Sequence, residues 1–440
     1  MQREGELLSF ERVIAHLRQT AARIPDQRTG TNCHYRIEDV ALSAFAMFFS
    51  QSPSFLDYQR RMNRRRSQHN AASLFGVEQI PSDNHIRSLL DAVPAASFYP
   101  VFDTIFDELA DAGELDRFRS IGGDVLVTID GTEYYRSEKI RCEHCRITHH
   151  SNGRTSYSHA VLTPAVVKPG MREVLALSPE FIRRGDGDKK TENELHAGKR
   201  WLARVADSLS PHSVTIMGDD IYATQSFLSQ VRDAELNFLC VCKPQSHKYL
   251  GEYIESLRTS GELEHTSETF WTGRERRTAV YEWAEDVPIR STADAMPVTW
   301  VSVEITTDDG TRVYRNSFIT NHRVSAETVS DLVAAGRARW KIENEDINTL
   351  KTKGYHLEHN FGHGSTHLAE TLATLMILAF LLHTLLDLYD ERYRMLREER
   401  GRRTRFFEEL GTLLGYLYFS SWEQLMRFMV TQLELPDPGG

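Results

Sequence analysis

Two short apolar runs, each leading into aspartate, constrain the fold of this chain more than any other feature of its sequence. The run Asp124–Asp130 (DVLVTID) is rich in β-branched residues and ends in an acid, and Ser213–Met217 leads through a glycine into Asp219 and Asp220. Such runs are typical of buried strands. If the two strands are neighbours in one sheet, Asp130 and Asp219 lie within a few ångströms of each other at its edge.

The segments between and after these runs predict a mixed α/β sheet. We expect strands at Ser156–Val167 and Glu173–Leu177, then a helix at Thr191–Leu209. A second helix at Gln225–Ala234 and a fifth strand at Asn237–Cys242 follow the second acidic run. This is the order of an RNase H-like core, which has three strands, a helix and a fourth strand, with acids at the ends of the first and fourth strands.

The rest of the chain divides by its periodicity. Helical spacing of apolar residues dominates both ends, whereas three runs before residue 325 alternate as antiparallel strands do, with a hairpin turn at Asp308–Gly310. We therefore predict an α/β fold whose RNase H-like mixed sheet carries a β-rich insertion and is flanked by helical regions. The expected boundaries are a helical N-terminal region at 1–120, core at 121–244, insertion at 245–325, core with the glutamate helix at 326–390, and a helical C-terminal region at 391–440.

Charge limits how this chain can bind nucleic acid. Its 440 residues hold 52 Lys and Arg against 62 Asp and Glu, a net charge of −10, which excludes a DNA binder that relies on bulk positive charge. One dense basic run is an exception to this net negative charge, and it is either a solvated helix face or a phosphate-binding patch. Its five arginines are Arg60, Arg61, Arg64, Arg65 and Arg66.

A third acid joins the two aspartates as a candidate for metal chemistry. Glu343 lies in a predicted helix, GRARWKIENEDINTLK, more than a hundred residues after Asp219. Clustered carboxylates repel one another unless cations neutralise them, and oxygen ligands favour Mg²⁺. Two such ions about 3.5–4 Å apart can activate water or a 3′-hydroxyl and stabilise the leaving oxygen of a phosphodiester. Each acid taken alone is also compatible with a turn, a cap or an exposed helix position.

Three motifs carry a family resemblance. The segment Arg339–Glu343 (RWKIE) resembles the Arg-Trp-x-Ile-Glu signature of DDE transposases of the insertion-sequence-4-like type. Leu126–Tyr135 (LVTIDGTEYY) and Ile216–Ala223 (IMGDDIYA) look like the first and second aspartate motifs of that family. The likeness spans about residues 122–390. It implies an RNase H-like enzyme that cuts transposon ends and transfers the 3′-OH into target DNA.

The resemblance also implies roles for individual residues. Asp130, Asp219 and Glu343 would be the metal-binding catalytic triad, with Mg²⁺ or Mn²⁺ as cofactor. Arg339 and Lys351 would hold DNA phosphates beside the cleavage point. The implied partners are double-stranded DNA, both inverted-repeat ends and target, and a second copy of the chain in a homodimer. The N-terminal helices with the arginine run would recognise end DNA.

The choice between the two adjacent aspartates rests on the spacing of a tyrosine. The family pattern is Asp-x-Gly-Tyr, and Tyr222 falls three residues after Asp219. Asp219 is therefore preferred over Asp220 as the second acid.

The chain departs from the family signature at two places. Gly336 stands where the family has tyrosine, and seven residues rather than six separate Glu343 from Lys351. One extra residue rotates a helical side chain by about 100°, so Lys351 either follows a local bulge or is not the equivalent lysine. Glu345 as the third acid would leave only five intervening residues. These departures keep two alternatives open: an inactive or domesticated relative that only binds DNA, and an RNase H-like nuclease without strand transfer.

Cysteine usage points to a metal half-site rather than to disulfides. Five cysteines are too few and too scattered for a disulfide scaffold and fit a reducing compartment. Cys142 and Cys145 form a Cys-x2-Cys pair that is a common half-site for tetrahedral Zn²⁺, and His149 or His150 could add ligands. The alternative is two ordinary cysteines in a hairpin between the first two core strands.

A histidine-rich stretch follows the glutamate helix at 354–368. Its glycines suggest an irregular connection, and we favour a structural or DNA-contacting role over a separate metal site. The four imidazoles belong to His356, His359, His363 and His367.

The most apolar stretch, Leu372–Leu388, contains threonines, a histidine and an aspartate and is slightly short for a bilayer. We interpret it as a buried helix. The N-terminus has no apolar signal region. The chain is therefore expected to bind no membrane and to be cytoplasmic, associated with the nucleoid when bound to DNA.

Overall fold

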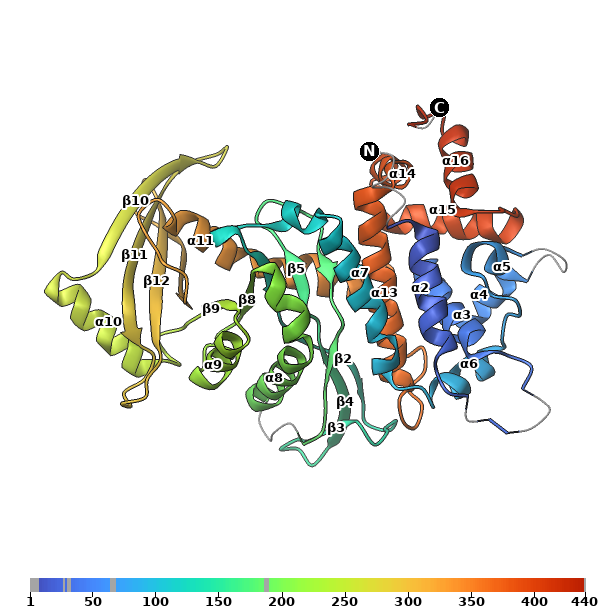
Figure 1. Cartoon of the computed structure of the whole chain (residues 1–440), viewed down its shortest axis with the longest axis horizontal. Helices are drawn as coiled ribbons and strands as arrows, with labels where there is room; N and C mark the ends of the chain where they lie inside the picture. Colours follow the sequence, from blue (N-terminus) through green and yellow to red (C-terminus); the bar gives the residue numbers. More distant parts are fainter. Residues whose placement is uncertain (1–7, 27, 30–32, 64–68, 186–189, 439–440) are drawn as a thin grey trace.

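The computed structural model places a strand-rich end, a central α/β core and a helical end along one long axis (Figure 1). It describes residues 8–26, 28–29, 33–63, 69–185 and 190–438.

A mixed sheet forms the centre of the molecule. Its core strands are β1 (Val125–Thr128), β5 (Ala165–Val167), β6 (Leu175–Ala176), β8 (Val214–Gly218) and β9 (Asn237–Val241). They lie in the order β6-β5-β1-β8-β9, with β1, β8 and β9 parallel and β5 and β6 antiparallel to their neighbours. This is the RNase H-like strand order, so the predicted fold class is confirmed.

Helices cover both faces of this sheet. Side chains alternate along a strand, so Val125 and Val127 pack on one face and Leu126 on the other. Helices α8 (Lys190–Leu209) and α9 (Gln225–Asp233) cover the first face, and α11 (Val329–Ala338) covers the second. Because both faces are buried, the strands read as continuous apolar runs rather than as alternating ones.

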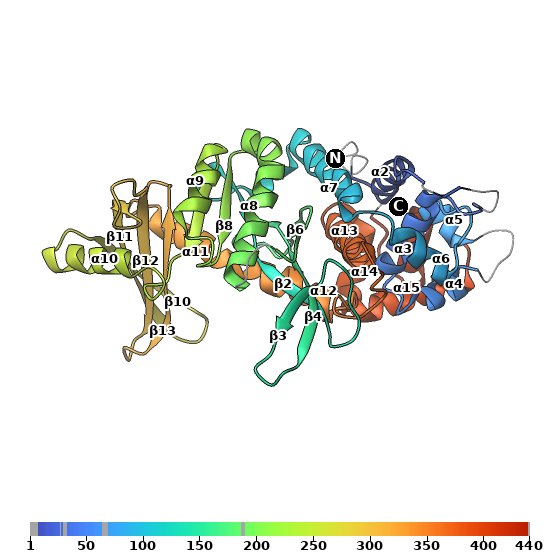
Figure 2. The same ribbon diagram turned by 90° about the horizontal axis from the view of Figure 1, so that it is seen from below.

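A second, smaller sheet projects from the core beside α12 (Figure 2). Its strands lie in the order β2-β4-β3, and β7 pairs with β4. Their bounds are β2 (Gly131–Ser137), β3 (Arg146–His149), β4 (Thr155–Leu162) and β7 (Glu180–Ile182).

The sequence did not indicate this second sheet, and one predicted strand is corrected by it. The run Ser156–Val167 was expected to be a single core strand, but it splits at Thr163 and Pro164 into β4 of the small sheet and β5 of the core. Proline cannot donate a ladder hydrogen bond, and the Thr163 amide instead donates to the carbonyl of Asp130 (3.0 Å). The chain therefore changes sheets at this point.

The insertion extends the central sheet. It begins with helix α10 (Lys248–Ser260) and continues as β10 (Glu264–Trp271), β11 (Arg276–Pro288), β12 (Pro297–Thr307) and β13 (Arg312–Thr320). Strand β13 pairs antiparallel with β9, so the core and insertion form one nine-stranded sheet. The sequence predicted three of these four strands. It missed β10, most of whose side chains are exposed, and the preceding helix.

Helices from both ends of the chain pack together at the far end of the molecule. The central helix is α13 (Leu368–Tyr389), which packs against α3 (Ile37–Phe49). By length and hydropathy α13 could cross a membrane, but 89% of its apolar window is buried within the structure, as in the core helix of a folded domain. The other α-helices here are α2 (Phe10–Ala22), α4 (Phe55–Met62), α5 (Asn70–Phe75), α6 (Asp83–Leu90), α7 (Tyr99–Asp111), α14 (Glu391–Arg400), α15 (Arg403–Tyr416) and α16 (Trp422–Gln432).

Four short 3₁₀ turns complete the connections. They are η1 (Ala95–Phe98), η2 (Glu114–Phe118), η3 (Ile121–Gly123) and η4 (Ser210–His212).

Candidate active site

The two strand-end aspartates lie level with each other. Strands β1 and β8 are parallel and pair Thr128 with Met217, and the Ile129 amide donates to the Met217 carbonyl (2.9 Å). Asp130 and Asp219 each follow that pair by two residues. Since adjacent strands are about 4.8 Å apart, the register itself brings the two carboxylates together at the carboxyl edge of the sheet.

Each aspartate has one oxygen held by the backbone. The Gly131 amide donates to Oδ1 of Asp130 (2.9 Å), and the Ile221 amide donates to Oδ1 of Asp219 (2.9 Å). These bonds fix the orientation of both carboxylates. The Oδ2 atom of Asp130 points to a guanidinium group.

That guanidinium belongs to Arg339, and it joins the third acid to the first. Arg339 donates from Nη1 to Oδ2 of Asp130 (3.3 Å) and from Nη2 to Oε1 of Glu343 (3.0 Å). The Arg339 side chain is only 11% exposed, whereas that of Glu343 is 48% exposed. Arg339 therefore joins Asp130 to Glu343, with Glu343 on the solvent side, and strand register sets Asp219 beside Asp130.

Burial makes the negative charges of this cluster costly. Burial is the main cause that raises the pKa of Asp130 to about 7, against the opposing effect of Arg339. The charges of Glu194, Glu343 and Asp219 contribute to the same rise. Burial also raises the pKa of Asp219. A carboxylate cluster of this kind is stabilised by a proton or a cation. Its oxygen donors fit a hard ion such as Mg²⁺.

The neighbouring acid, Asp220, faces away from this cluster. Its Oδ1 accepts a hydrogen bond from the Lys243 amide and lies 3.4 Å from Nε2 of His247. Although burial acts to raise the pKa of Asp220, the bonds from His247, Ser246 and the Lys243 amide outweigh it and lower that pKa. The geometry thus supports the choice of Asp219 as the second acid.

A fourth acid, which sequence reasoning missed, lies beside Asp130. Glu194 of α8 is 4% exposed, and a side chain at Gly131 would come within 2.6 Å of its carboxyl carbon. Its Oε1 accepts a hydrogen bond from the hydroxyl of the buried Tyr222 (3.3 Å). The signal was present in the sequence, because Glu194 is two turns before Trp201 and so falls on the apolar stripe of its helix.

Close packing around Tyr222 explains the glycines nearby. A Cβ atom at Gly218 or at Gly198 would lie 2.6 Å from the Tyr222 ring. The ring is thus held between the exit of β8 and the middle of α8.

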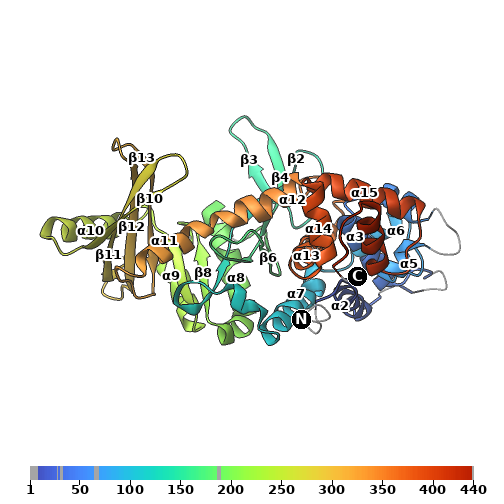
Figure 3. The same ribbon diagram turned by 90° about the horizontal axis from the view of Figure 1, so that it is seen from above.

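A π-helical segment accounts for the extra residue between Glu343 and Lys351. The predicted single helix is divided into α11, a π-helical segment η5 (Ile342–Ile347) and α12 (Asn348–Thr352), which run on as one rod across the core (Figure 3). A π-turn accommodates one extra residue within a helix, so the segment supplies the local bulge that the seven-residue spacing requires. Lys351 then points back to the core, where Nζ donates to the Glu133 carbonyl (3.1 Å) and lies 2.8 Å from Oε1 of Glu358.

The other departure from the family signature also has a packing reason. A Cβ atom at Gly336 would lie 2.6 Å from the ring of Phe318 on β13. A larger residue at this position would therefore clash with an aromatic ring from the insertion.

The described part of the arginine run does not lie beside the acids. Arg60 and Arg61 end helix α4, at the helical end of the molecule and away from β1 and β8 (Figure 1). Arg60 is exposed, whereas Nε of Arg61 forms an ion pair with Oδ2 of Asp57 (2.6 Å). The remaining predicted members, Arg64, Arg65 and Arg66, lie outside the described residues.

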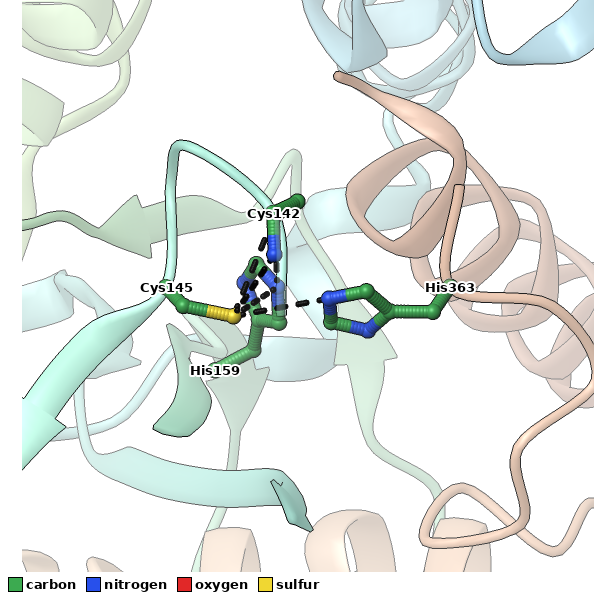
Figure 4. A group of neighbouring side chains, drawn as sticks. All are labelled: Cys142, Cys145, His159 and His363. Carbon is green, nitrogen blue, oxygen red and sulfur yellow. Dashed lines mark hydrogen bonds between the residues drawn. The ribbon is translucent and has the colours of Figure 1, made fainter. Parts of the chain in front are cut away.

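A second group of functional side chains lies where the small sheet meets the segment after α12. Cys142, Cys145, His159 and His363 point their ligand atoms at one another (Figure 4). Burial raises the pKa of Cys142 to about 12 and lowers the pKa of His159 to about 3. The donor set of two thiols and two imidazoles could hold a structural zinc ion.

The histidines predicted to complete this site are corrected by the structure. His149 and His150 lie at the end of β3, where they contact the hydroxyls of Thr155 (3.1 Å) and Ser156 (2.8 Å). Strand β3 directs them away from the cysteines, and the neighbouring strand β4 supplies His159 instead. His363 comes from the stretch for which we expected a structural or DNA-contacting role, and only the tertiary fold brings it to the cysteines.

Comparison with known proteins gives a distant structural likeness only. No family model matches the chain, and no curated protein matches its sequence. The chain is similar to a piggyBac transposase in a synaptic complex with hairpin DNA, over 99% of this chain and 85% of that one, at 10% identity and a TM-score of 0.43. At this identity and score, the function has to be argued from the residues of this chain. The specific resemblance to the insertion-sequence-4-like type stays a prediction.

Proposed function

We propose that this chain is a DNA transposase that cleaves transposon ends and transfers the 3′-OH into target DNA. Asp130, Asp219 and Glu343 are assigned as the catalytic acids that hold Mg²⁺ or Mn²⁺. The observation that carries the proposal is the meeting of these acids at the carboxyl edge of an RNase H-like sheet. Two of them are aligned by strand register, and the third is joined to the first through Arg339.

The residues of the chain prepare this site in three ways. The amides of Gly131 and Ile221 each fix one aspartate oxygen. Arg339 holds Asp130 and Glu343 side by side before a cation neutralises them. Divalent ions, when bound, would activate a water or a 3′-hydroxyl and stabilise the leaving oxygen. Arg339 would then be free to bind the phosphate beside the cleavage point.

DNA would contact the protein at two separate places. Lys351 lies beside β2, the strand that begins directly after Asp130, since its ammonium group reaches the carbonyl of Glu133. We assign it to hold DNA on this side of the cleavage point. Arg60 and Arg61, with which the arginine run begins, lie at the other end of the molecule. The run would bind the phosphates of end DNA further along the duplex. We assign the inverted-repeat ends and the target as double-stranded partners, bound by a homodimer.

The test uses a supercoiled plasmid that carries the DNA flanking this gene on both sides. With Mg²⁺ the wild-type protein should cut at the element ends. Asp130→Asn should abolish cutting but retain binding to end DNA, because the substitution removes a metal-ligand charge and leaves the basic residues. Asp220→Asn is the matched control and should cut normally, since Asp220 faces away from the cluster. Cutting by Asp130→Asn at the wild-type rate would refute the assignment.

Two further outcomes separate the alternatives. Salt-sensitive DNA binding without any Mg²⁺-dependent cutting by the wild type would indicate a DNA-binding relative. Pre-cleaved ends with a free 3′-OH test the other alternative, because a transposase joins them to target DNA whereas a nuclease without strand transfer leaves them unjoined.

A further inference from the structure

We propose that Cys142, Cys145, His159 and His363 bind one Zn²⁺ ion, which cross-links the sheet that follows Asp130 to the segment that follows Glu343. The four side chains come from three separate places in the chain: a turn before β3, strand β4, and the connection between α12 and α13. Cys145 and His363 are 218 residues apart in sequence. Their four ligand atoms all lie within 4.8 Å of one another, and Figure 4 shows the four residues gathered around the Cys145 sulfur.

The spacing of the ligand atoms matches a tetrahedral zinc site. With Zn–S of about 2.3 Å and Zn–N of about 2.05 Å, tetrahedral geometry places the two sulfurs about 3.8 Å apart and each sulfur about 3.6 Å from each nitrogen. The two Sγ atoms are 3.9 Å apart. Nε2 of His159 lies 3.3 Å from Sγ of Cys142 and 3.4 Å from Sγ of Cys145, and Nε2 of His363 lies 3.4 Å from Sγ of Cys145.

The separation of the sulfurs also argues against a disulfide. A disulfide requires about 2.05 Å between sulfur atoms, whereas the observed 3.9 Å is that of two ligands on one ion. Two soft sulfur donors with two imidazoles in a tetrahedral array favour zinc over the hard ions that carboxylates bind.

The surroundings describe a closed, structural site. Cys145 and His159 are each 2% exposed, and His363 is 6% exposed. The rings of Tyr134 and Tyr135 pack on His159 and His363 with centroids 5.8 Å and 4.4 Å apart, so both imidazoles are held in orientation. Cys142 is partly exposed. A catalytic zinc site keeps a position open for water or substrate, whereas a set of four protein ligands, three of them buried, is typical of a structural site.

The ion would join the two segments that carry acids of the candidate active site. His159 is paired with Tyr135 on strand β2, and β2 begins directly after Asp130. His363 follows α12, whose Lys351 bonds the carbonyl of Glu133 on the same strand. The metal would therefore be a second, stronger tie between these segments. This positioning role rests on the proposed function, whereas the metal site itself does not.

A neighbouring contact extends the same junction to α13. His144, which lies between the two cysteines, has Nδ1 3.4 Å from Oε1 of Glu370, a residue that is 2% exposed on α13. The cysteine turn is thus packed against the start of α13 as well as against the segment before it.

The first test measures metal content without DNA. The full chain, purified under reducing conditions without chelator, should contain one zinc ion per molecule when measured by inductively coupled plasma mass spectrometry. His363→Ala and Cys145→Ser should lose the zinc and unfold at a temperature several degrees lower. His149→Ala is the matched control and should keep one zinc, because His149 is exposed and bonds only a nearby threonine among the described residues.

The second test needs no variant and so holds even where a substitution prevents folding. X-ray absorption at the zinc edge of the wild-type protein should show two sulfurs at about 2.3 Å and two nitrogens at about 2.0–2.1 Å. The proposal would be overturned if the wild-type protein contained no zinc or a stoichiometric metal other than zinc, or if the first shell of the zinc held no sulfur. Retention of zinc by His363→Ala, or a Cys142–Cys145 disulfide in reducing buffer, would overturn it as well.

The positioning role is tested by Mg²⁺-dependent cutting. We expect His363→Ala to cut DNA at least tenfold more slowly than His149→Ala at a temperature where both are folded. Equal rates would refute the positioning role. Zinc in a wild-type protein that never cuts DNA would refute the proposed function alone, and cutting by a zinc-free wild type would refute this inference alone.

Discussion

Replacing Asp346 by asparagine is expected to stabilise this protein by an amount that grows with pH. Asp346 lies in the π-helical segment, three residues after Glu343, and its side chain is fully buried. Neither of its carboxyl oxygens has a hydrogen-bond partner among the described residues. Burial alone raises its pKa to about 8. The native state therefore holds a neutral carboxyl group where the unfolded chain holds a charged one.

The sign and size of the change in unfolding free energy follow from this difference in charge. An unfolded aspartate has a pKa of about 3.9, so the folded state binds the proton more tightly. The stability that this proton supplies is complete below about pH 4 and is lost as the pH rises to about 8. The two pKa values differ by about four units, and each unit is worth about 1.4 kcal/mol. An asparagine side chain at this position has no proton to lose, so the gain of Asp346→Asn should rise by about 1.4 kcal/mol per pH unit to at most about 6 kcal/mol.

Urea unfolding followed by circular dichroism checks this prediction. The free energy of unfolding would be measured for wild type and Asp346→Asn from about pH 5 to about pH 8, and the difference between them cancels the groups that titrate alike in both. A difference for Asp346→Asn that is flat with pH would show that this carboxyl group is ionised or partnered in the native protein, and would refute the reasoning.

Three further substitutions test the candidate active site. Gly218→Ala places a Cβ atom 2.6 Å from the Tyr222 ring and should lower the free energy of unfolding by about 1–3 kcal/mol; unchanged urea unfolding would contradict this packing. Glu194→Gln removes a negative charge that raises the pKa of Asp130 and should weaken Mn²⁺ binding severalfold in a calorimetric titration, whereas unaltered affinity would place Glu194 outside the ion's influence. Arg339→Lys cannot reach both carboxylates as a guanidinium fork does, and DNA cutting should fall about tenfold, the worth of one charged hydrogen bond; a wild-type rate would show that the bridge is dispensable.

The core strands and the acids that end them could be predicted because their signals are local. A buried strand such as β1 is a short run of β-branched residues, and Asp130 and Asp219 stand at the ends of such runs. The small sheet was not predicted, because β4 and β5 lie in one nearly continuous run of strand-forming residues. The change of sheets at Pro164 depends on which partner strand the chain meets. The lysine spacing left two interpretations open, a local bulge or a different lysine, and the π-helix is such a bulge.

In the metal cluster, likewise, the sequence reveals some members and only the tertiary fold brings in the others. Two of its members, Cys142 and Cys145, are three residues apart, so one turn suffices to bring them together and their spacing is visible in the sequence. The other two come from β4 and from a connection more than two hundred residues away. The nearby histidines at 149 and 150 were the natural choice by sequence distance, but strand β3 directs them elsewhere.

The sequence by itself determined the sheet class, the two strand-end aspartates, the glutamate in its helix and the cysteine half-site, because each depends on residues within about one turn or one strand of one another. Only the tertiary structure decided that Glu194 joins the acids, that Arg339 bridges Asp130 to Glu343, and that His159 and His363 complete the cysteine cluster. These contacts join segments distant in sequence, and strand register and helix packing fix them rather than any local preference.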